Sequence, residues 1–272
     1  MMGAARPPEG AHTAAEGAGA PVSAAASHAD ADGTVLQVQR AEGVWTLTLN
    51  RPDKLNALDA QLVDALLQAV ASANAQGARL LILRGAGKSF SAGFDLSGLQ
   101  AQSEGDLLLR FVRIEMLLQA IAQSPAQTLA LAHGKVFGAG VDLLAVCRHR
   151  IASPDTLLRM PGLQFGLVLG SRRFGAIVGA ERARAVLESG QGFSAGQAHA
   201  MGFVTRVADM AAWPAIIEEV DAAAAALEDI TRAELYRVLG PVNANEDLAT
   251  LTRSAARPGL KQRLQAYLGR AR

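Results

Sequence analysis

Residues 89–95 read SFSAGFD and residues 133–142 read HGKVFGAGVD, and these two loops decide the fold. Each follows a short apolar run and contains small residues, so each can expose backbone N–H groups. Two such loops facing each other could hold a developing oxyanion between two amides, which is a large term in acyl-group catalysis. The sequence therefore indicates enolate or acyl chemistry on a carbonyl.

Each loop taken alone has other interpretations. Ala92-Gly93 suits an ordinary tight turn, because glycine readily supplies a positive φ. Gly138-Ala139-Gly140 suits close packing of a helix on a strand, or a phosphate-binding turn. A nucleotide-binding fold is disfavoured, since the pattern is not G-x-G-x-x-G and lies in the middle of the chain.

Length and composition exclude several classes of protein. The chain has 272 residues, of which 50% are hydrophobic and 19% charged, and its net charge is +1. These values suit one large domain with a sizeable core and give no sign of a nucleic-acid surface. No stretch reaches about 18 uninterrupted apolar residues, so no membrane span is predicted.

The residues that could bind metal or form disulfides are few. Cys147 is the only cysteine, which excludes an internal disulfide and a multi-thiolate metal site and favours a reducing compartment, by default the cytoplasm. His133 and His149 have no Ser, Cys or second His at catalytic or ligand spacing, so both are interpreted as structural. We expect no metal site.

The chain divides into three parts. Residues 1–32 are rich in Ala, Gly, Ser and Pro and have no periodic apolar face, so they predict a disordered tail. Residues 33–205 are expected to form an α/β core, and residues 206–272 a helical C-terminal region.

The first half of the core alternates between strands and helices. Residues 34–39 and 44–49 are β-prone runs joined by a short turn, which predicts a hairpin. Apolar residues over 58–70 have the spacing of an amphipathic helix. The continuous apolar run at 80–83 is typical of a strand buried on both faces.

A second unit repeats this order. Residues 107–121 predict a helix, 128–132 a buried strand and 140–146 a helix, so a largely parallel sheet of the α/β class is favoured. Beyond Ser171 the chain is expected to be nearly all helical. The helices predicted there, the first capped by Ser194, are 195–201, 210–227, 231–239, 245–255 and 259–268.

Five segments in this order carry a family resemblance. They are LNRPDKLNAL at 49–58, FSAGFD at 90–95, GAGVD at 138–142, FSAGQA at 193–198 and GFV at 202–204. Together the segments resemble the crotonase (enoyl-CoA hydratase/isomerase) superfamily over roughly residues 34–272. The resemblance implies a spiral of stacked ββα units with a helical C-terminal region. That region would mediate assembly into a trimer or a dimer of trimers, or cover the site.

The resemblance also implies a set of site residues. The backbone N–H groups of Phe94 and Ala139 would form the oxyanion hole for a small-molecule acyl-CoA, with coenzyme A as part of the substrate and no prosthetic group. Lys54 would lie near coenzyme A, although it also suits an ordinary solvated loop lysine. The other expected coenzyme A contacts are Leu55, Ala57, Ser91, Ala92, Gly93 and Asp95, and the expected substrate-pocket residues are Gly138, Gly162 and Gly170.

The acid and base positions depart from the family pattern. Hydratases of this superfamily use two glutamates, and here Asp142 stands at the first position and Gly162 at the second. Asp142 is expected to act as a base, because the N-terminal end of its helix would lower its pKa, although that same position favours an aspartate with no catalytic role. Glu115 and Asp155 could replace the missing acid only if the fold turns them inward.

Two arginines lie near the expected acyl pocket. Arg172 or Arg173 could bind a substrate carboxylate or cap a helix, and the structural interpretation is favoured because arginines form many ion pairs.

The leading expectation is hydration or isomerisation of an enoyl-CoA. Since a proton shuttle between the α and γ carbons needs only one base, isomerisation tolerates Gly162 better than hydration does. The alternatives are a one-carboxylate double-bond isomerase, decarboxylase or thioesterase, and a CoA-binding protein without turnover.

Overall fold

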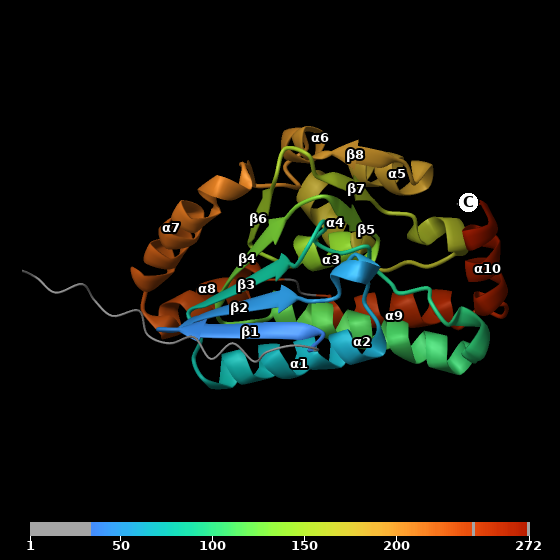
Figure 1. Cartoon of the computed structure of the whole chain (residues 1–272), viewed down its shortest axis with the longest axis horizontal. Coiled ribbons are helices and arrows are strands. Elements are labelled where there is room, and N and C mark those ends of the chain that lie inside the picture. Colours follow the sequence, from blue (N-terminus) through green and yellow to red (C-terminus); the bar gives the residue numbers. More distant parts are fainter. Residues whose placement is uncertain (1–33, 241–242, 271–272) are drawn as a thin grey trace, which may run out of the picture.

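Two sheets and the helices around them make up the part of the chain that the computed structural model describes, residues 34–240 and 243–270 (Figure 1). The predicted tail, residues 1–32, lies outside the described residues.

The larger sheet has six strands in the order β1-β2-β3-β4-β6-β9. β1 and β2 form the predicted antiparallel hairpin, with Glu42 and Gly43 at positive φ in its turn. From β2 onward all neighbours are parallel, so the α/β class is confirmed. The strands are β1 (Leu36–Ala41), β2 (Val44–Leu49), β3 (Leu80–Gly85), β4 (Gln127–Ala132), β6 (His149–Ala152) and β9 (Arg206–Val207).

Helices cover both faces of this sheet, which explains the continuous apolar runs of its central strands. In β3, Leu81 and Leu83 face the main core, whereas Leu80 and Ile82 face a second core that contains Trp213. The covering helices are α1 (Ala60–Ala75) and α2 (Glu104–Ala122) on the first face and α7 (Trp213–Ala225) on the second.

A smaller sheet of three strands lies beside the first (Figure 1). It consists of β5 (Lys135–Phe137), β7 (Leu157–Arg159) and β8 (Gly192–Ser194). The described chain beyond Ser171 is nearly all helical, as predicted; the exceptions are β8 and β9, which were not predicted because strands of two or three residues carry no periodic signal. The helices near this sheet are α3 (Ala139–Ala145), α4 (Ser171–Val178), α5 (Ala180–Ser189) and α6 (Ala195–Ala200).

The predicted cap of the helix after residue 194 is confirmed. The Ser194 side chain accepts a hydrogen bond from Gln197 N–H, and the Gln197 side chain accepts one from Ser194 N–H, which is a complete capping box. The short helical turns of the described chain are η1 (Pro52–Lys54), η2 (Leu99–Ala101), η3 (Gly162–Phe165) and η4 (Met210–Ala212).

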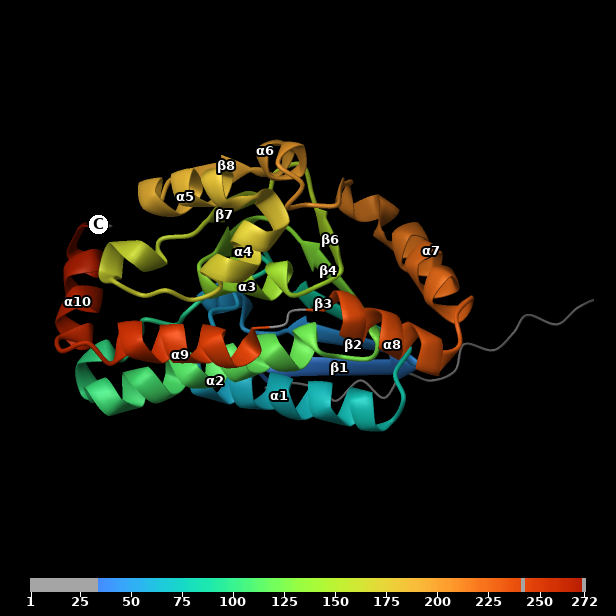
Figure 2. The same ribbon diagram turned by 180° about the vertical axis from the view of Figure 1, so that it is seen from behind.

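The C-terminal helices pack against the end of the core. α9 runs beside α2, and α10 stands across the end of that pair, against η3 (Figure 2). A third apolar core joins them and includes Phe111, Leu251 and Leu264. These helices, all predicted, are α8 (Asp229–Leu239), α9 (Ala244–Ala255) and α10 (Leu260–Arg270). Within residues 34–240 and 243–270 no helix combines the length and the apolar character that crossing a membrane requires.

Candidate active site

The two small-residue loops meet through their backbones. The first follows β3 and the second follows β4, so both leave the carboxyl ends of neighbouring parallel strands. Phe90 N–H donates to the His133 carbonyl at 2.8 Å, and Phe137 N–H donates to the Ser91 carbonyl at 3.0 Å. The loops therefore face each other, as the sequence predicted.

Glycine makes the close approach possible. Gly93 has φ +82°, and a Cβ there would fall within 3.0 Å of the Phe137 carbonyl oxygen. A Cβ on Gly140 would lie 2.5 Å from the Ser91 carbonyl oxygen. Both positions exclude any larger residue, since real Cβ atoms essentially never approach this closely.

Phe94 and Ala139 lie on either side of this contact. Both residues line one cavity, and no backbone hydrogen bond from either N–H occurs within the described ranges. The Phe94 ring stacks on Phe111 with centroids 4.1 Å apart, and the guanidinium of Arg110 lies 4.1 Å from the Phe94 ring centroid. The side chain of Phe94 is thus held from both faces, which fixes the backbone that carries its N–H.

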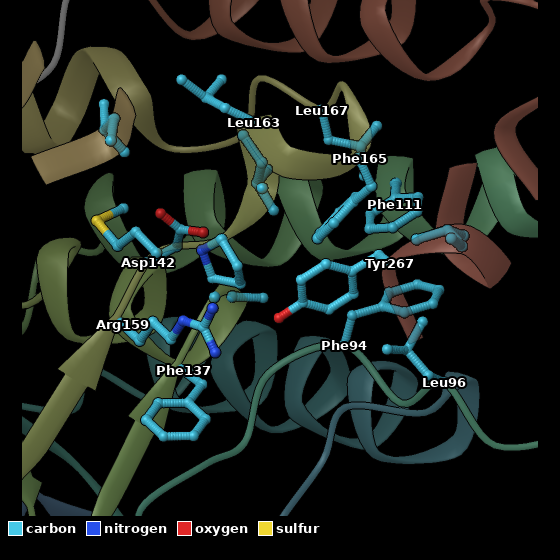
Figure 3. A pocket seen from close by; sticks show the side chains of 18 of the residues that line it. Phe94, Leu96, Phe111, Phe137, Asp142, Arg159, Leu163, Phe165, Leu167 and Tyr267 are labelled. Carbon is cyan, nitrogen blue, oxygen red and sulfur yellow. The ribbon is translucent and has the colours of Figure 1, made fainter. Parts of the chain in front are cut away.

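The cavity has a volume of about 130 Å³ and a mostly apolar wall (Figure 3). α2, α3, η3 and α10 all contribute to it. Its apolar residues include Phe94, Leu96, Phe111, Phe137, Met160, Leu163, Phe165, Leu167, Leu169 and Leu264, and its polar side chains are those of Asp142, Arg159, Ser171 and Tyr267. An apolar cavity with few polar groups is typical of a small-molecule site.

Asp142 is the only carboxyl that residues 34–240 and 243–270 contribute to the wall of this cavity. It lies in the first turn of α3 and is 3% exposed, and its Oδ1 has no hydrogen-bond partner among the described residues. Burial raises the pKa of Asp142 well above its usual range; Arg173 opposes the rise and Glu115 adds to it. This direction is opposite to the one expected from the helix terminus alone, because loss of hydration outweighs the helix dipole.

Two of the expected pocket glycines line the cavity, and the third, Gly170, lies against the Asp142 carboxyl. Gly138 and Gly162 line the cavity, Gly162 in the turn η3. Gly170 has φ +65°, and a Cβ there would fall within 3.0 Å of Asp142 Oδ1. Gly170 therefore leaves the space that the Asp142 side chain occupies.

Neither candidate for a second acid lies in the cavity wall. Glu115 does turn inward, but Arg173 binds it, with Nη1 donating to Glu115 Oε2 at 3.0 Å and Nη2 donating to Oε1. Asp155 is exposed and accepts a hydrogen bond from Ser153 Oγ. In the part of the chain that the structure describes, no second carboxyl joins Asp142 at the cavity.

Arg172 and Arg173 join α4 to its neighbours instead of lining the cavity. Arg173 is buried against Glu115 of α2, and Arg172 Nε donates to Asp247 of α9 at 2.8 Å. The structural interpretation of both arginines agrees with these pairings, whereas a role in binding a substrate carboxylate finds no support in them.

The expected coenzyme A contacts lie along the rim of the first loop. Ala92 lines the cavity, and its N–H donates to the Leu55 carbonyl at 2.8 Å. Lys54 is exposed on η1, whereas Ala57 is buried.

Two of these residues have structural partners. Ser91 Oγ donates to the Asn56 carbonyl at 2.9 Å, and Asp95 Oδ2 pairs with Arg51 at 2.8 Å. Burial opposes ionisation of Asp95, but hydrogen bonds from Ser97 and Arg51 hold its pKa below the ordinary value. These side chains position the loop.

The other sequence candidates lie away from the cavity. His133 Nε2 lies 2.9 Å from the Gly87 carbonyl oxygen, and His149 Nε2 lies 2.6 Å from Gln127 Nε2, in keeping with structural roles. Cys147 is buried at the end of α3, and burial raises the pKa of its thiol to about 12. In the described chain no three His, Cys, Asp or Glu residues cluster as a metal site would require.

Sequence reasoning missed Phe111, Arg159 and Tyr267, which come from α2, β7 and α10 and meet only in the folded chain. Arg159 lies two residues before Pro161, and no repeat or spacing in the sequence sets it apart.

Comparison with known proteins agrees with this architecture. The family model for enoyl-CoA hydratase/isomerase matches residues 39–255. "Probable enoyl-CoA hydratase echA6" of Mycobacterium bovis is 36% identical over 189 residues, which are 67% of this chain and 76% of that protein.

Solved structures are similar over most of the chain. One from Bordetella parapertussis, named as an enoyl-CoA hydratase/isomerase, is 53% identical with a TM-score of 0.86, over 87% of this chain and 99% of that one. An enoyl-CoA hydratase from Bacillus halodurans has the same fold. It is 22% identical with a TM-score of 0.76, over 85% of this chain and 99% of that one.

Gly93→Ala should separate the two loops. The added Cβ would collide with the Phe137 carbonyl, so we expect the variant to lose thioester binding and to unfold at a lower temperature. Gly77→Ala is the matched control, because Gly77 also has positive φ, +66°, but has nothing within 4 Å of the added Cβ. Calorimetry measures the affinity, and thermal unfolding measures the stability. If both variants lost equal affinity and equal stability, the strain of an alanine at positive φ would explain the losses, and the collision with the Phe137 carbonyl would not.

Asp142→Asn should stabilise the protein increasingly as the pH rises. Above about pH 4 the unfolded chain releases the Asp142 proton while the folded chain keeps it, so the free energy of unfolding of the parent falls with pH. The free energy of unfolding of the asparagine variant does not fall in this way. The difference in free energy of unfolding between the variant and the parent should therefore grow by up to about 1.4 kcal/mol per pH unit until the folded carboxyl ionises. Denaturant unfolding between pH 4 and 8 measures it, with the exposed Asp209→Asn as control. A pH-independent difference would contradict the raised pKa.

Proposed function

Because the chain belongs to the enoyl-CoA hydratase/isomerase family, we propose that it acts on acyl-CoA thioesters and holds the thioester oxygen between the N–H groups of Phe94 and Ala139. The observation that carries this proposal is the meeting of both loops at one apolar cavity that also contains a buried carboxyl. Coenzyme A is part of the substrate, and no prosthetic group is needed for this chemistry.

The two amides would act on the charge that develops during reaction. A thioester carbonyl gains negative charge when its α-carbon loses a proton, and N–H groups fixed in advance stabilise that charge without reorganising. Within the described chain neither N–H donates to a backbone carbonyl, so both are available to the thioester oxygen. Their positions depend on Gly93 and Gly140, whose lack of a Cβ lets the two loops approach each other.

Asp142 would be the proton carrier. Ionised Asp142 would remove a proton from the α-carbon of a 3-enoyl-CoA and return it to the γ-carbon, which moves the double bond and leaves the carboxylate unchanged. A carboxyl whose pKa burial raises well above its usual range is a stronger base once ionised and can both take and give the proton.

Isomerisation is favoured over hydration by the residue at position 162. Hydration needs one group to activate water and another to protonate the α-carbon, and Gly162 supplies no side chain for the second task. A hydratase, a decarboxylase, a thioesterase and a CoA-binding protein without turnover are the alternatives that the same scaffold allows.

The reaction is tested by offering matched 3-enoyl-CoA and 2-enoyl-CoA thioesters to the parent and to Asp142→Asn. We expect the parent to form the conjugated 2-enoyl product faster than it hydrates it, and Asp142→Asn to lower kcat at least about 100-fold, with the Asp209→Asn control unchanged. Because the base must be ionised, kcat should rise with pH through a limb above the pKa of an ordinary aspartate.

Several outcomes would contradict this assignment. An Asp142→Asn protein as active as the parent would exclude Asp142 as the base. Binding of coenzyme A thioesters without conversion of any of them would favour the non-catalytic alternative.

Assembly into a trimer or a dimer of trimers is also proposed, with α8 at the interface. Ile230 is 83% exposed, Leu239 76% and Val238 62%, and such a group of apolar side chains on one helix suits a buried contact between copies. The cytoplasmic location expected from the cysteine content remains a prediction.

Ile230→Lys should break this assembly. A lysine in an apolar interface loses hydration without gaining a partner, so we expect light scattering to give the mass of one chain for the variant and a multiple of three for the parent. Leu109→Lys is the control, because Leu109 is 59% exposed but lies on α2. A single-chain mass for the parent would overturn the proposed assembly.

A further inference from the structure

The backbone of Arg159 lies next to the proposed oxyanion hole. It is the last residue of β7 and pairs with Phe137 of β5. Its carbonyl accepts a hydrogen bond from Gly138 N–H at 2.8 Å, and Gly138 immediately precedes Ala139. The backbone of Arg159 is therefore fixed close to the position expected for the thioester oxygen.

The Arg159 guanidinium is oriented by a hydrogen bond, but no carboxylate of the described chain compensates its charge. Arg159 Nε donates to the Gly190 carbonyl at 2.8 Å, which orients the group. Within residues 34–240 and 243–270 no carboxylate forms an ion pair with Arg159, and its two terminal nitrogens have no recorded acceptor. The described part of the cavity wall thus contains a cation, Arg159, that does not pair with Asp142, the carboxyl on that wall.

Tyr267 provides a second donor to the same space. Its ring packs on Phe165 with centroids 5.0 Å apart, and in Figure 3 its hydroxyl and the Arg159 guanidinium both point towards the middle of the cavity. Arg159 and Tyr267 also line an adjoining hollow of about 290 Å³, together with Gln164 and Arg270. Among the described residues, the side chains of that hollow include two cations and no anion.

We propose that Arg159, assisted by the Tyr267 hydroxyl, binds a carboxylate carried by the acyl chain, so that the substrates are coenzyme A thioesters of dicarboxylic acids. A guanidinium offers a carboxylate two parallel N–H groups, and in an apolar cavity such a pair is stronger than at the surface. The inference rests on the proposed function, since it assumes that the thioester lies at Phe94 and Ala139.

The coenzyme A phosphates are the other anions that Arg159 could meet. The pantetheine arm separates them from the thioester, whereas the backbone of Arg159 is hydrogen-bonded to the residue beside Ala139. The acyl chain is therefore the closer source of negative charge, and the two sources predict different results for free coenzyme A.

The test compares two saturated thioesters of equal chain length, glutaryl-CoA and pentanoyl-CoA, and free coenzyme A, by titration calorimetry. We expect the parent to bind glutaryl-CoA about 10- to 100-fold more tightly than pentanoyl-CoA. Arg159→Met should abolish this preference and leave pentanoyl-CoA affinity unchanged, which also shows that the variant is folded. Arg159→Lys should keep part of the preference, and Tyr267→Phe should reduce it.

Arg184→Met is the control, because Arg184 is exposed on α5 and pairs with Glu181; it should keep the full preference. Equal affinity of the parent for the two thioesters would overturn this inference alone. A parallel loss of affinity for glutaryl-CoA, pentanoyl-CoA and free coenzyme A in Arg159→Met would assign Arg159 to the phosphates and also overturn it. Failure of the parent to bind any of the three would overturn the proposed function as well.

Discussion

The hydrogen bond from Phe137 N–H to the Ser91 carbonyl holds the two loops of the site in register. Gly93 and Gly140 let the backbones approach on either side of this bond, so the directions of the neighbouring N–H groups are set by main chain and not by mobile side chains. Main-chain groups cannot rotate freely as side chains do, and an amide fixed in this way needs no rearrangement when charge appears. The contact lies beside the cavity whose wall includes Phe94, Ala139 and Asp142.

A third loop secures the first. Asn56 is fully buried at φ 55°, a conformation that asparagine tolerates better than most residues. Its amide donates to the carbonyls of Ala86 and Ser89, and its Oδ1 accepts from Arg51 N–H, all at 2.8 Å. The Asn56 side chain thereby provides hydrogen-bond partners for backbone groups of two loops, and these groups would otherwise have none.

Sequence reasoning succeeded where a signal extends over many residues. The apolar run at 80–83 and the joint spacing of the loop motifs predicted the parallel sheet and the family. Three-residue strands such as β8 carry no such signal, and Arg159 is a single residue whose neighbours in the cavity come from distant elements. The pKa of Asp142 was predicted in the wrong direction because the helix terminus is local information, whereas burial depends on how α3 packs against α2 and α4.

Cys147 makes the molecule convenient for spectroscopy. Its thiol is buried, donates to the Leu143 carbonyl and, with a pKa raised to about 12, carries almost no thiolate at neutral pH. Thiolates attack maleimides and methanethiosulfonates, so the native chain offers these reagents no reactive partner. A cysteine introduced on α10 or on the rim of the loops would accept a single spin label or fluorophore, and distances across the site could be followed without removing a native residue.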